Sequence, residues 1–522
     1  MGAIHYYEKE RVFKLDTPHT SYLIGIVDEE GFLGHMYYGA KITDYDVRAL
    51  MRTGEAPFVP SQNNRDRSSF LDVFPMEYPG HGVGDYRESA ISVSDKSGNT
   101  AVQPLYREHK IYAGKPGLPG LPATFGSEEE CETLEIVLAD EVLDLTVTLY
   151  YTAFCDVDVI ARSVRVTNHA KEPVYLTKVF SAALDLDAED YRMLTLHGSW
   201  ARERQIEYRQ IGYGKQSVGS CRGESSHQEH PFVALVSANA GQEQGRVYGF
   251  HFVYSGNFLA QVEKNQFDSL RVVMGIHPQD FKWELKQGET FTAPEVVLTY
   301  SDAGLGGMTR TLHDLYRKHL IRSPYKDRER PVLINNWEAT YFEFDTEKLL
   351  AIAREAKKSG IEMLVMDDGW FGHRNDDNTS LGDWQINEQK ITGGLKRLVD
   401  QVNEIGLEFG IWFEPEMISP DSDLYRTHPD WAIALPGRTP CRSRNQYVLD
   451  LSRKEVRDYA YECVASILRS ANIAYVKWDM NRQLTDLGSS ALPVENQGEL
   501  LHRYVLGVYE LQERLITEFP EL

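Results

Sequence analysis

Carboxylates, amides and tryptophans stand together at four places in the second half of the chain, each directly after an apolar run. The four groups are Asn335-Asn336-Trp337-Glu338, Asp367-Asp368-Gly369-Trp370, Trp412-Phe413-Glu414-Pro415-Glu416 and Lys477-Trp478-Asp479-Met480-Asn481-Arg482. A carboxylate can accept hydrogen bonds from hydroxyl groups, attack a carbon atom or give a proton to a leaving oxygen. Tryptophan offers a flat apolar surface to the C–H face of a sugar ring. Any one group alone could cap a helix or lie in a surface loop, but together the four predict a site for carbohydrate chemistry.

The spacing of Lys477, Asp479 and Asn481 is informative in itself. Side chains alternate along a strand, so residues two apart point to the same side. A cation two residues from Asp479 favours the ionised form of its carboxylate, as a nucleophile requires. The alternative is an ion pair between Lys477 and Asp479 inside the fold, without a catalytic role.

Signals for a cofactor or a metal are weak. Residues 80–84 read Gly-His-Gly-Val-Gly, but no helix pattern follows them, as phosphate binding would require. The patterns HExxH and GxSxG do not occur. Residues 373–378 lack the twelve-residue calcium pattern, so we expect a solvated turn there. We predict neither a cofactor nor a metal.

Alternating apolar strands and amphipathic helices would position the four groups. The strands are predicted at 331–339, 362–370, 408–416 and 473–481, and the helices at 345–360, 393–406, 454–472 and 498–519. We expect the first strand, 331–339, to be buried. Such alternation is typical of a parallel sheet, and in a barrel of eight repeats the active site lies at the carboxyl ends of the strands. Residues 331–522 are therefore predicted to form the first half of a (β/α)8 barrel.

The first part of the chain has a different pattern. Short alternating runs, separated by turn-forming residues, lie at 133–154, 159–186, 246–263 and 293–302. This is typical of an antiparallel sandwich. Residues 308–322 have the apolar spacing of a helix. We predict an antiparallel β-domain over 1–325, with a helical connector at about 303–330.

Composition narrows the class of partner. The chain has 522 residues, 42% hydrophobic and 25% charged, with a formal net charge of −23. This acidity argues against nucleic acid, an anionic membrane surface and an anionic substrate, so a neutral substrate fits best. The first residues lack the apolar core of a secretory signal, and no apolar run approaches the ~18 residues that span a bilayer. Five cysteines without a CxxC spacing indicate free thiols, and we predict a cytoplasmic protein.

The motifs NNWEATYFEF, LVMDDGWFG, WFEPEM and YVKWDMNR together resemble those of the bacterial α-galactosidases of glycoside hydrolase family 36. The segments EYPGHGVGDYR (77–87), HGSWARER (197–204), SSHQEHPF (225–232) and YSGNFLAQVE (254–263) look like that family's N-terminal β-supersandwich. The resemblance implies an N-terminal antiparallel β-supersandwich followed by an incomplete (β/α)8 (TIM) barrel. It also implies a retaining hydrolase of terminal α-galactosyl residues in melibiose, raffinose or stachyose, acting as a homo-oligomer, a tetramer by resemblance.

The same resemblance implies roles for single residues. Asp479 is like the family's nucleophile, and Asp367 and Asp368 are like the pair that binds the O4 and O6 hydroxyls of galactose. The other matching positions are Trp412 as aromatic platform, Arg444 near the reaction centre, Lys477 and Asn481 as sugar contacts, and Trp337 and Trp200 at the substrate entrance. Glu414 and Glu416 match no catalytic position, and we expect them to brace the strand end.

The sequence departs from the family's pattern in one respect. In the family, the fifth barrel strand ends in an ESC-and-glycine-rich motif, and the sixth carries the acid/base Asp. Neither motif occurs here, so we expect the chain to stop before its acid/base and to be inactive alone. Three alternatives remain: an α-glucosidase or α-xylosidase of a related clan, a galactosyltransferase of the raffinose-synthase type, and a non-catalytic sugar-binding remnant. The Asp367-Asp368 pair disfavours the first, and the missing acid/base favours the last.

Overall fold

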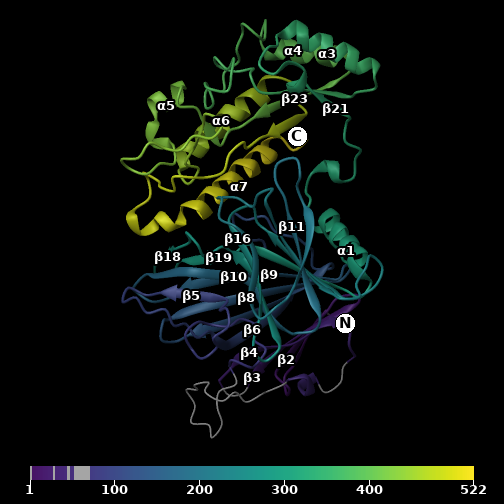
Figure 1. Cartoon of the computed structure of the whole chain (residues 1–522), viewed down its shortest axis with the longest axis vertical. Helices are drawn as coiled ribbons and strands as arrows, with labels where there is room; N and C mark the ends of the chain where they lie inside the picture. Colours follow the sequence, from purple (N-terminus) through teal and green to yellow (C-terminus); the bar gives the residue numbers. More distant parts are fainter. Residues whose placement is uncertain (1–2, 28–29, 44–46, 52–70) are drawn as a thin grey trace. The chain divides into compact units, whose positions relative to one another are not determined.

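The computed structural model describes residues 3–27, 30–43, 47–51 and 71–522 (Figure 1). The chain divides into two units, Met1–Ile321 and Arg322–Leu522. The first is built from antiparallel sheets, and the second from parallel strands that alternate with helices. The predicted fold class, an antiparallel β-domain followed by a domain of the TIM-barrel type, is confirmed.

The N-terminal unit contains the following elements within the described residues. They are β1 (Ile4–Tyr7), β2 (Val12–Asp16), β3 (Thr20–Val27), β4 (Phe32–Ala40), η1 (Val47–Leu50), β5 (Ile91–Ser94), β6 (Leu105–Ala113), β7 (Cys131–Asp140), β8 (Leu145–Phe154), β9 (Val159–Asn168), β10 (Val174–Asp187), β11 (Tyr191–His197), β12 (Gln205–Gln210), β13 (Gly214–Ser220), β14 (Glu229–Ser237), β15 (Val247–Val253), β16 (Phe258–Lys264), β17 (Ser269–Ile276), β18 (Trp283–Leu285), β19 (Thr290–Thr292), β20 (Glu295–Ser301) and α1 (Gly304–His319).

These strands form three antiparallel sheets in the part of the chain that the structure describes. The first has the order β1–β2–β3–β4, and the second β13–β16–β17–β10–β18, with β5 also paired to β10. The third has the order β12–β11–β14–β15–β20–β9–β8–β7–β6, with β19 paired to β9. Neighbouring strands are mostly close in sequence, as in a structure built from hairpins.

The strands predicted in this unit are confirmed. Residues 133–154 form β7 and β8, residues 159–186 form β9 and β10, residues 246–263 form β15 and β16, and residues 293–302 contain β20. In β7, Leu134, Ile136 and Leu138 are buried, and the residues between them are partly exposed. The alternation in the sequence therefore reflects one face turned to the core.

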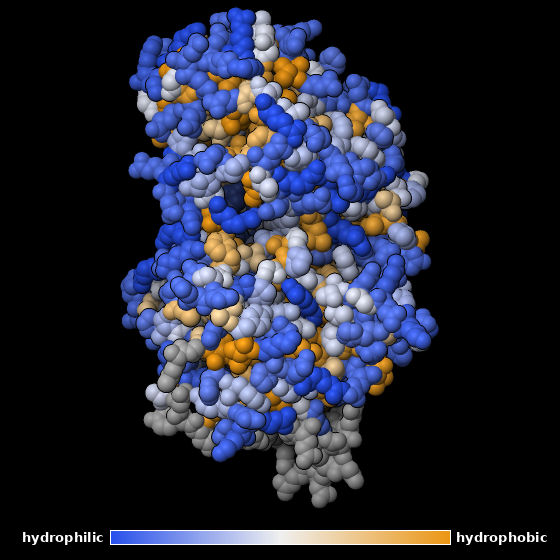
Figure 2. Space-filling view, turned by 180° about the vertical axis from the view of Figure 1, so that it is seen from behind, coloured by the Kyte–Doolittle hydropathy of each residue, from blue (hydrophilic) through white to orange (hydrophobic). Residues whose placement is uncertain are grey.

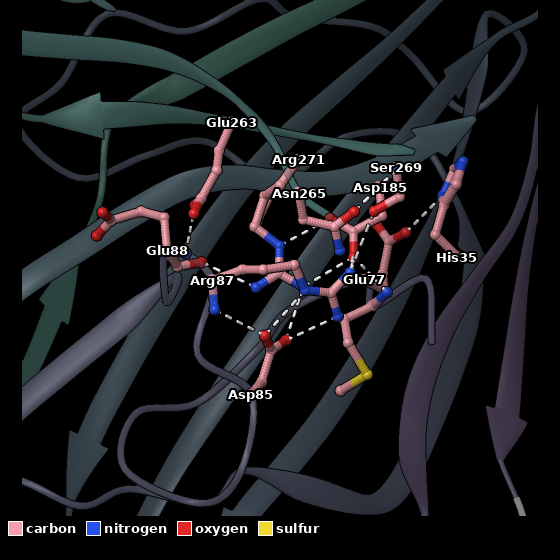
Figure 3. Close-up of polar contacts among 12 residues, drawn as sticks. His35, Glu77, Asp85, Arg87, Glu88, Asp185, Glu263, Asn265, Ser269 and Arg271 are labelled. Carbon is pink, nitrogen blue, oxygen red and sulfur yellow. Dashed lines mark hydrogen bonds and ion pairs between the residues drawn. The ribbon is translucent and has the colours of Figure 1, made fainter. Parts of the chain in front are cut away.

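Charged side chains are buried together inside the N-terminal unit (Figure 3). Arg271 donates from Nε to Oδ1 of Asp185 at 2.7 Å and from Nη2 to Oδ2 of Asp85 at 2.7 Å. Arg87 donates from Nε to Oδ1 of Asp85 and from Nη1 to Oδ2 of Asp185, both at 2.9 Å. Burial acts to raise the pKa of Asp85, but the charges and hydrogen bonds of Arg271 and Arg87 hold it below its ordinary value. Two cations and two anions are thus paired with one another inside this unit.

The C-terminal unit carries the following elements within the described residues. They are η2 (Pro324–Lys326), β21 (Leu333–Asn335), α2 (Trp337–Thr340), α3 (Thr346–Lys358), β22 (Met363–Met366), α4 (Leu395–Ile405), β23 (Glu408–Phe413), β24 (Met417–Ile418), α5 (Asp423–Thr427), η3 (Pro429–Trp431), β25 (Tyr447–Val448), α6 (Lys454–Ser470), β26 (Tyr475–Trp478), η4 (Val494–Glu499) and α7 (Leu500–Glu518).

The parallel sheet of this unit has the order β21–β22–β23–β26, each strand paired in parallel with the next. The four predicted helices are α3, α4, α6 and α7, and α3 packs beside α4 and α6 beside α7 (Figure 1). The side chain of Asp345 caps α3 by accepting a hydrogen bond from the backbone N–H of Lys348. Helix α4 ends at Ile405 and is capped by Gly406, whose φ of 90° suits glycine.

One predicted strand is wrong in its extent and in its burial. Residues 331–339 were expected to form a buried strand, but β21 covers only Leu333–Asn335 and is exposed or partly exposed. The helix α2 follows it at once. Among the described strands, β21 pairs only with β22 and is an edge strand, whereas β22 and β23 lie inside the sheet and are buried. An apolar run predicts a strand, but it does not say whether that strand has one neighbour or two.

The surface agrees with the acidic, polar composition. On the face shown in Figure 2, hydrophilic residues predominate and hydrophobic residues gather in small groups among them. Across the described residues, no helix combines the length and the apolarity that crossing a membrane would need.

Replacing Asp185 with alanine should lower the free energy of unfolding by about 3–5 kcal/mol, because two buried guanidinium groups lose their shared carboxylate. The matched control is Glu172→Ala, which removes the exposed ion pair between Lys96 and Glu172 (2.8 Å) and should cost less than about 1 kcal/mol. Urea unfolding followed by circular dichroism measures both. Equal losses in the two variants would contradict the role given to the buried network.

Candidate active site

The predicted polar groups lie at or just beyond the carboxyl ends of the parallel strands. Asp367 directly follows β22, Glu414 follows β23, and Asp479 follows β26. Parallel strands end at the same edge of a sheet, so residues far apart in the sequence meet there. The backbone N–H of Asp479, for example, donates to the carbonyl oxygen of Phe413 at 2.8 Å.

The carboxylate of Asp479 is held through one of its two oxygens. Oδ2 accepts a hydrogen bond from the indole Nε1 of Trp412 at 2.9 Å and another from the amide Nδ2 of Asn481 at 2.7 Å. No described residue donates to Oδ1. The side chain is partly exposed. The arrangement therefore fixes the plane of the carboxylate and leaves one oxygen with its lone pairs available for attack.

Lys477 pairs with a different acid from the one that its spacing suggested. Its Nζ donates to Oδ2 of Asp367 at 2.9 Å, and the amide of Asn335 donates to the same oxygen at 2.6 Å. Oδ1 of Asp367 accepts from the backbone N–H of Asp368 at 2.9 Å. Asp367 is buried and has a cation at hydrogen-bond distance. The alternative of an ion pair between Lys477 and Asp479 is therefore wrong, because the ammonium group of Lys477 bonds to Asp367, just beyond β22.

Asp368 is also buried, and Arg374 holds it in a fork. The guanidinium donates from Nε to Oδ1 at 3.0 Å and from Nη2 to Oδ2 at 2.8 Å. Burial raises the pKa of Asp368 above its ordinary value, although Arg374 opposes that shift. Asp367 and Asp368 are thus adjacent carboxylates, each with a cationic partner of its own.

Sequence reasoning missed two basic residues at this site. Residues 373–378 were expected to form a solvated turn, but Arg374 is fully buried within that polar run, and the expectation is wrong for it. Lys390 donates from Nζ to the carbonyl oxygens of Phe342, Gly369 and Arg374. Burial lowers the pKa of Lys390. Neither residue belongs to a recognisable motif, and only the folded chain shows their partners.

The remaining predicted residues differ in how closely they join this centre. The Trp412 ring is buried, so its visible role is to donate to Asp479. Arg444, at a φ of 52°, is exposed, and its Nη1 lies 3.4 Å from Oδ1 of Asn481. Trp337 is partly exposed on α2 and packs edge-on against Tyr341. Trp200 belongs to the N-terminal unit and is 83% exposed, and its role at the entrance stays a prediction.

Glu414 and Glu416 are buried and bonded internally. Oε1 of Glu414 accepts from the backbone N–H of Asn481 at 2.6 Å and from Nε2 of Gln446 at 2.7 Å. Glu416 accepts from the indole Nε1 of Trp478 at 2.8 Å and from the hydroxyl of Tyr504 at 2.5 Å. Burial raises the pKa of Glu414 to about 7, helped by the negative charge of Asp479 and opposed by these hydrogen bonds. Both side chains join β23 to later parts of the unit.

Comparison with known proteins assigns both parts of the sequence. Residues 290–522 match the family model described as Melibiase, and residues 31–286 match that of the glycosyl hydrolase family 36 N-terminal domain. The α-galactosidase AgaA of Geobacillus stearothermophilus is 50% identical over 522 residues, which cover 100% of this chain and 71% of the relative.

Solved structures of α-galactosidases from the same family are also similar to this chain. The crystal structure of the GH36 α-galactosidase AgaB from the same organism has a TM-score of 0.97 and 49% identity, covering 100% of this chain and 71% of the other. Substituted forms of AgaA in complex with raffinose and with stachyose have TM-scores of 0.96 and 50% identity, covering 98% of this chain and 71% of theirs.

Glu414 should make stability depend on pH near neutrality. Its pKa in the folded chain, about 7, lies above the ordinary glutamate value of 4.5, so folding favours the protonated form. The stabilisation is fully present below pH 4.5 and is lost as the pH rises through 7. Relative to Glu414→Gln, the parent should therefore lose about 3 kcal/mol of unfolding free energy between these limits. Urea unfolding of both proteins across pH 4.5–8 measures this loss. A difference in unfolding free energy that stays constant over this range would contradict the prediction.

Proposed function

We propose, from the premise that this chain belongs to glycosyl hydrolase family 36, that it acts on terminal α-galactosyl groups with Asp479 as the nucleophile. The observation that carries the proposal is the bonding of Asp479. Two donors fix Oδ2, and no described residue donates to Oδ1. The acids Asp367 and Asp368 follow β22, which is separated from β26 by β23 in the sheet. A carboxylate held by hydrogen bonds, near other acids that can bind hydroxyl groups, is what a retaining glycosidase needs.

The proposed substrates are neutral α-galactosides such as melibiose, raffinose and stachyose. AgaA, at 50% identity, has been crystallised with raffinose and with stachyose in substituted forms, which supports this class. A net charge of −23 is compatible with an uncharged ligand. We propose that Asp367 and Asp368 accept hydrogen bonds from O4 and O6 of the galactosyl ring, and that Lys477 and Asn481 complete the contacts.

The proposed reaction is a double displacement. Oδ1 of Asp479 attacks the anomeric carbon as the bond to the leaving oxygen breaks, which forms a covalent galactosyl ester. Water then opens the ester, and galactose leaves with net retention of configuration. Trp412 and Asn481 hold the carboxylate so that little reorganisation is needed when it attacks.

Protonation of the leaving oxygen needs a second group. Asp367 and Asp368 are tied to Lys477 and Arg374, and Glu414 and Glu416 are buried with internal donors, so we assign that role to none of these four. A positioned acid typically contributes roughly 10²–10⁴-fold. A chain that lacks such an acid should therefore hydrolyse natural galactosides slowly. The attack by Asp479 is better tested with fluoride, which leaves without a proton.

A 5-fluoro-α-galactosyl fluoride should label Asp479 covalently, because the second fluorine slows hydrolysis of the ester. Mass spectrometry of the intact protein and of its peptides should show one galactosyl adduct, on Asp479. The variant Asp479→Asn should remain unlabelled. Asp400→Asn changes an exposed acid that pairs with Lys396 on α4 and should be labelled like the parent. An adduct on another residue, or on Asp479→Asn, would overturn the assignment of the nucleophile.

The acids after β22 should make the site select galactose over glucose. The O4 hydroxyl is axial in galactose and equatorial in glucose, so a glucoside would leave a buried carboxylate without its hydroxyl partner. We expect labelling by the α-galactosyl fluoride to be roughly 10⁴-fold faster than labelling by its α-glucosyl counterpart. The variant Asp367→Asn should narrow this ratio, mainly by slowing the galactosyl reaction. Equal rates for the two sugars in the parent would exclude the proposed specificity.

A further inference from the structure

Glu414 reaches the nucleophile through one intermediate residue. Its Oε1 accepts from the backbone N–H of Asn481 at 2.6 Å, and the side chain of that asparagine donates to Oδ2 of Asp479 at 2.7 Å. Gln446, next to β25, donates from Nε2 to the same oxygen of Glu414 at 2.7 Å. The glutamate is only 1% exposed, so it touches no substrate. Beyond the direct effect of charge, the described hydrogen bonds connect it to the nucleophile through Asn481.

Asn481 needs such an anchor because it lies outside the sheet. The strand β26 ends at Trp478, so the ladder between β23 and β26 does not fix the backbone of Asn481. Asp479 is still tied to β23 through its backbone N–H and Phe413, but two residues further on the described backbone bond goes to Glu414. A shift of Asn481 would remove one of the two donors that distinguish Oδ2 from Oδ1.

Resting on the assignment of Asp479 as the nucleophile, we propose that Glu414 is a positioning residue for it. Glu414 holds Asn481 so that its amide donates to Oδ2 of Asp479, which leaves Oδ1 facing the anomeric carbon. This role goes beyond a brace of the strand end, because it fixes which oxygen of the carboxylate attacks.

The charged groups around Glu414 give this role a pH signature. The nearby acid is Asp479, just after β26. Two arginines contact the partners of Glu414: Arg482 donates to the carbonyl oxygen of Gln446, and Arg444 donates to Oδ1 of Asn481. Burial, with the charge of Asp479, holds the pKa of Glu414 at about 7. An ionised acceptor binds the N–H of Asn481 more strongly than a neutral one, so attack by Asp479 should become faster as the pH rises through 7.

Glu416 offers a matched control on the same strand end. It is a buried glutamate two residues further on, and its oxygens accept from Trp478 and Tyr504 rather than from Asn481 or Asp479. A purely structural brace would behave like Glu416. Changing either residue to leucine removes a buried acid, but only the change at position 414 releases Asn481.

The experiment measures the rate at which 5-fluoro-α-galactosyl fluoride labels Asp479, together with the affinity for galactose, in folded variants. The fluoride ion leaves as the ester bond between Oδ1 and the anomeric carbon forms, so no acid group is involved. We expect Glu414→Leu to slow labelling by about 10- to 100-fold, as for loss of a charge-assisted hydrogen bond. Affinity for galactose should change less than about threefold, and Glu416→Leu should label within about threefold of the parent.

A double-mutant cycle decides whether the effect passes through Asn481. Asn481→Ala should slow labelling, and the double variant of Glu414→Leu with Asn481→Ala should be no slower than Asn481→Ala alone, because the two residues act in series. Effects that multiply would overturn the proposal, as would labelling of Glu414→Leu at the parent's rate. A parent that binds galactose but is never labelled on Asp479 would instead remove the nucleophile assignment, and this proposal with it.

Glu414→Gln keeps the test valid if the leucine variant does not fold. Glutamine retains an oxygen that can accept from Asn481 and Gln446, but it cannot ionise. Its labelling rate should therefore stay close to the parent's at acidic pH and should lack the rise through pH 7. The same ionisation in the profile of Glu414→Gln would show that another group produces it and would overturn the role given to Glu414.

Discussion

The two hydrogen bonds to one oxygen of Asp479 are the constraint around which the candidate site is arranged. The oxygens of a carboxylate are equivalent until their surroundings distinguish them. Trp412, on β23, and Asn481, beyond β26, both donate to Oδ2, so the distinction depends on how these two strands lie side by side. Their parallel register pairs Trp412 with Lys477 and Phe413 with Trp478. A change of that register would separate the indole from the carboxylate, so the position of Asp479 depends on the pairing of β23 with β26.

The two acids after β22 are held by different kinds of cation. Arg374 grips Asp368 with a planar fork and is itself buried, which fixes the orientation of that carboxylate. Lys477 meets Asp367 with a single ammonium group that is partly exposed. A lysine has three donors and a flexible stem, so it can hold Asp367 and still offer a hydrogen bond to a ligand. The guanidinium of Arg374 therefore fixes its carboxylate with two bonds, whereas Lys477 holds Asp367 with one.

Sequence reasoning succeeded where the signal is local and failed where it depends on long-range partners. Helix α3 and strand β22 follow from periodicity and caps that lie within a few residues, and the strand-end position of Asp479 follows from the pattern of strands and helices. The partner of Lys477 is 110 residues away in the sequence, and spacing alone suggested the nearer acid, Asp479. Arg374 lies in a polar run, and its burial comes from Asp368 and the surrounding loop. The apolar run of β21 likewise gave no sign that the strand lies at an edge.

Acids in the two units differ in how much of their hydrogen-bonding capacity is used. In the N-terminal unit, Asp185 accepts four hydrogen bonds, from Arg271 twice, from Arg87 and from the backbone of Met76. Asp185 is only 1% exposed, so it is closed to a ligand and serves to stabilise the fold. Asp479 accepts two, both on Oδ2. Its unused capacity lies on one oxygen, at the edge where the strands end, and that capacity makes it suited to reaction.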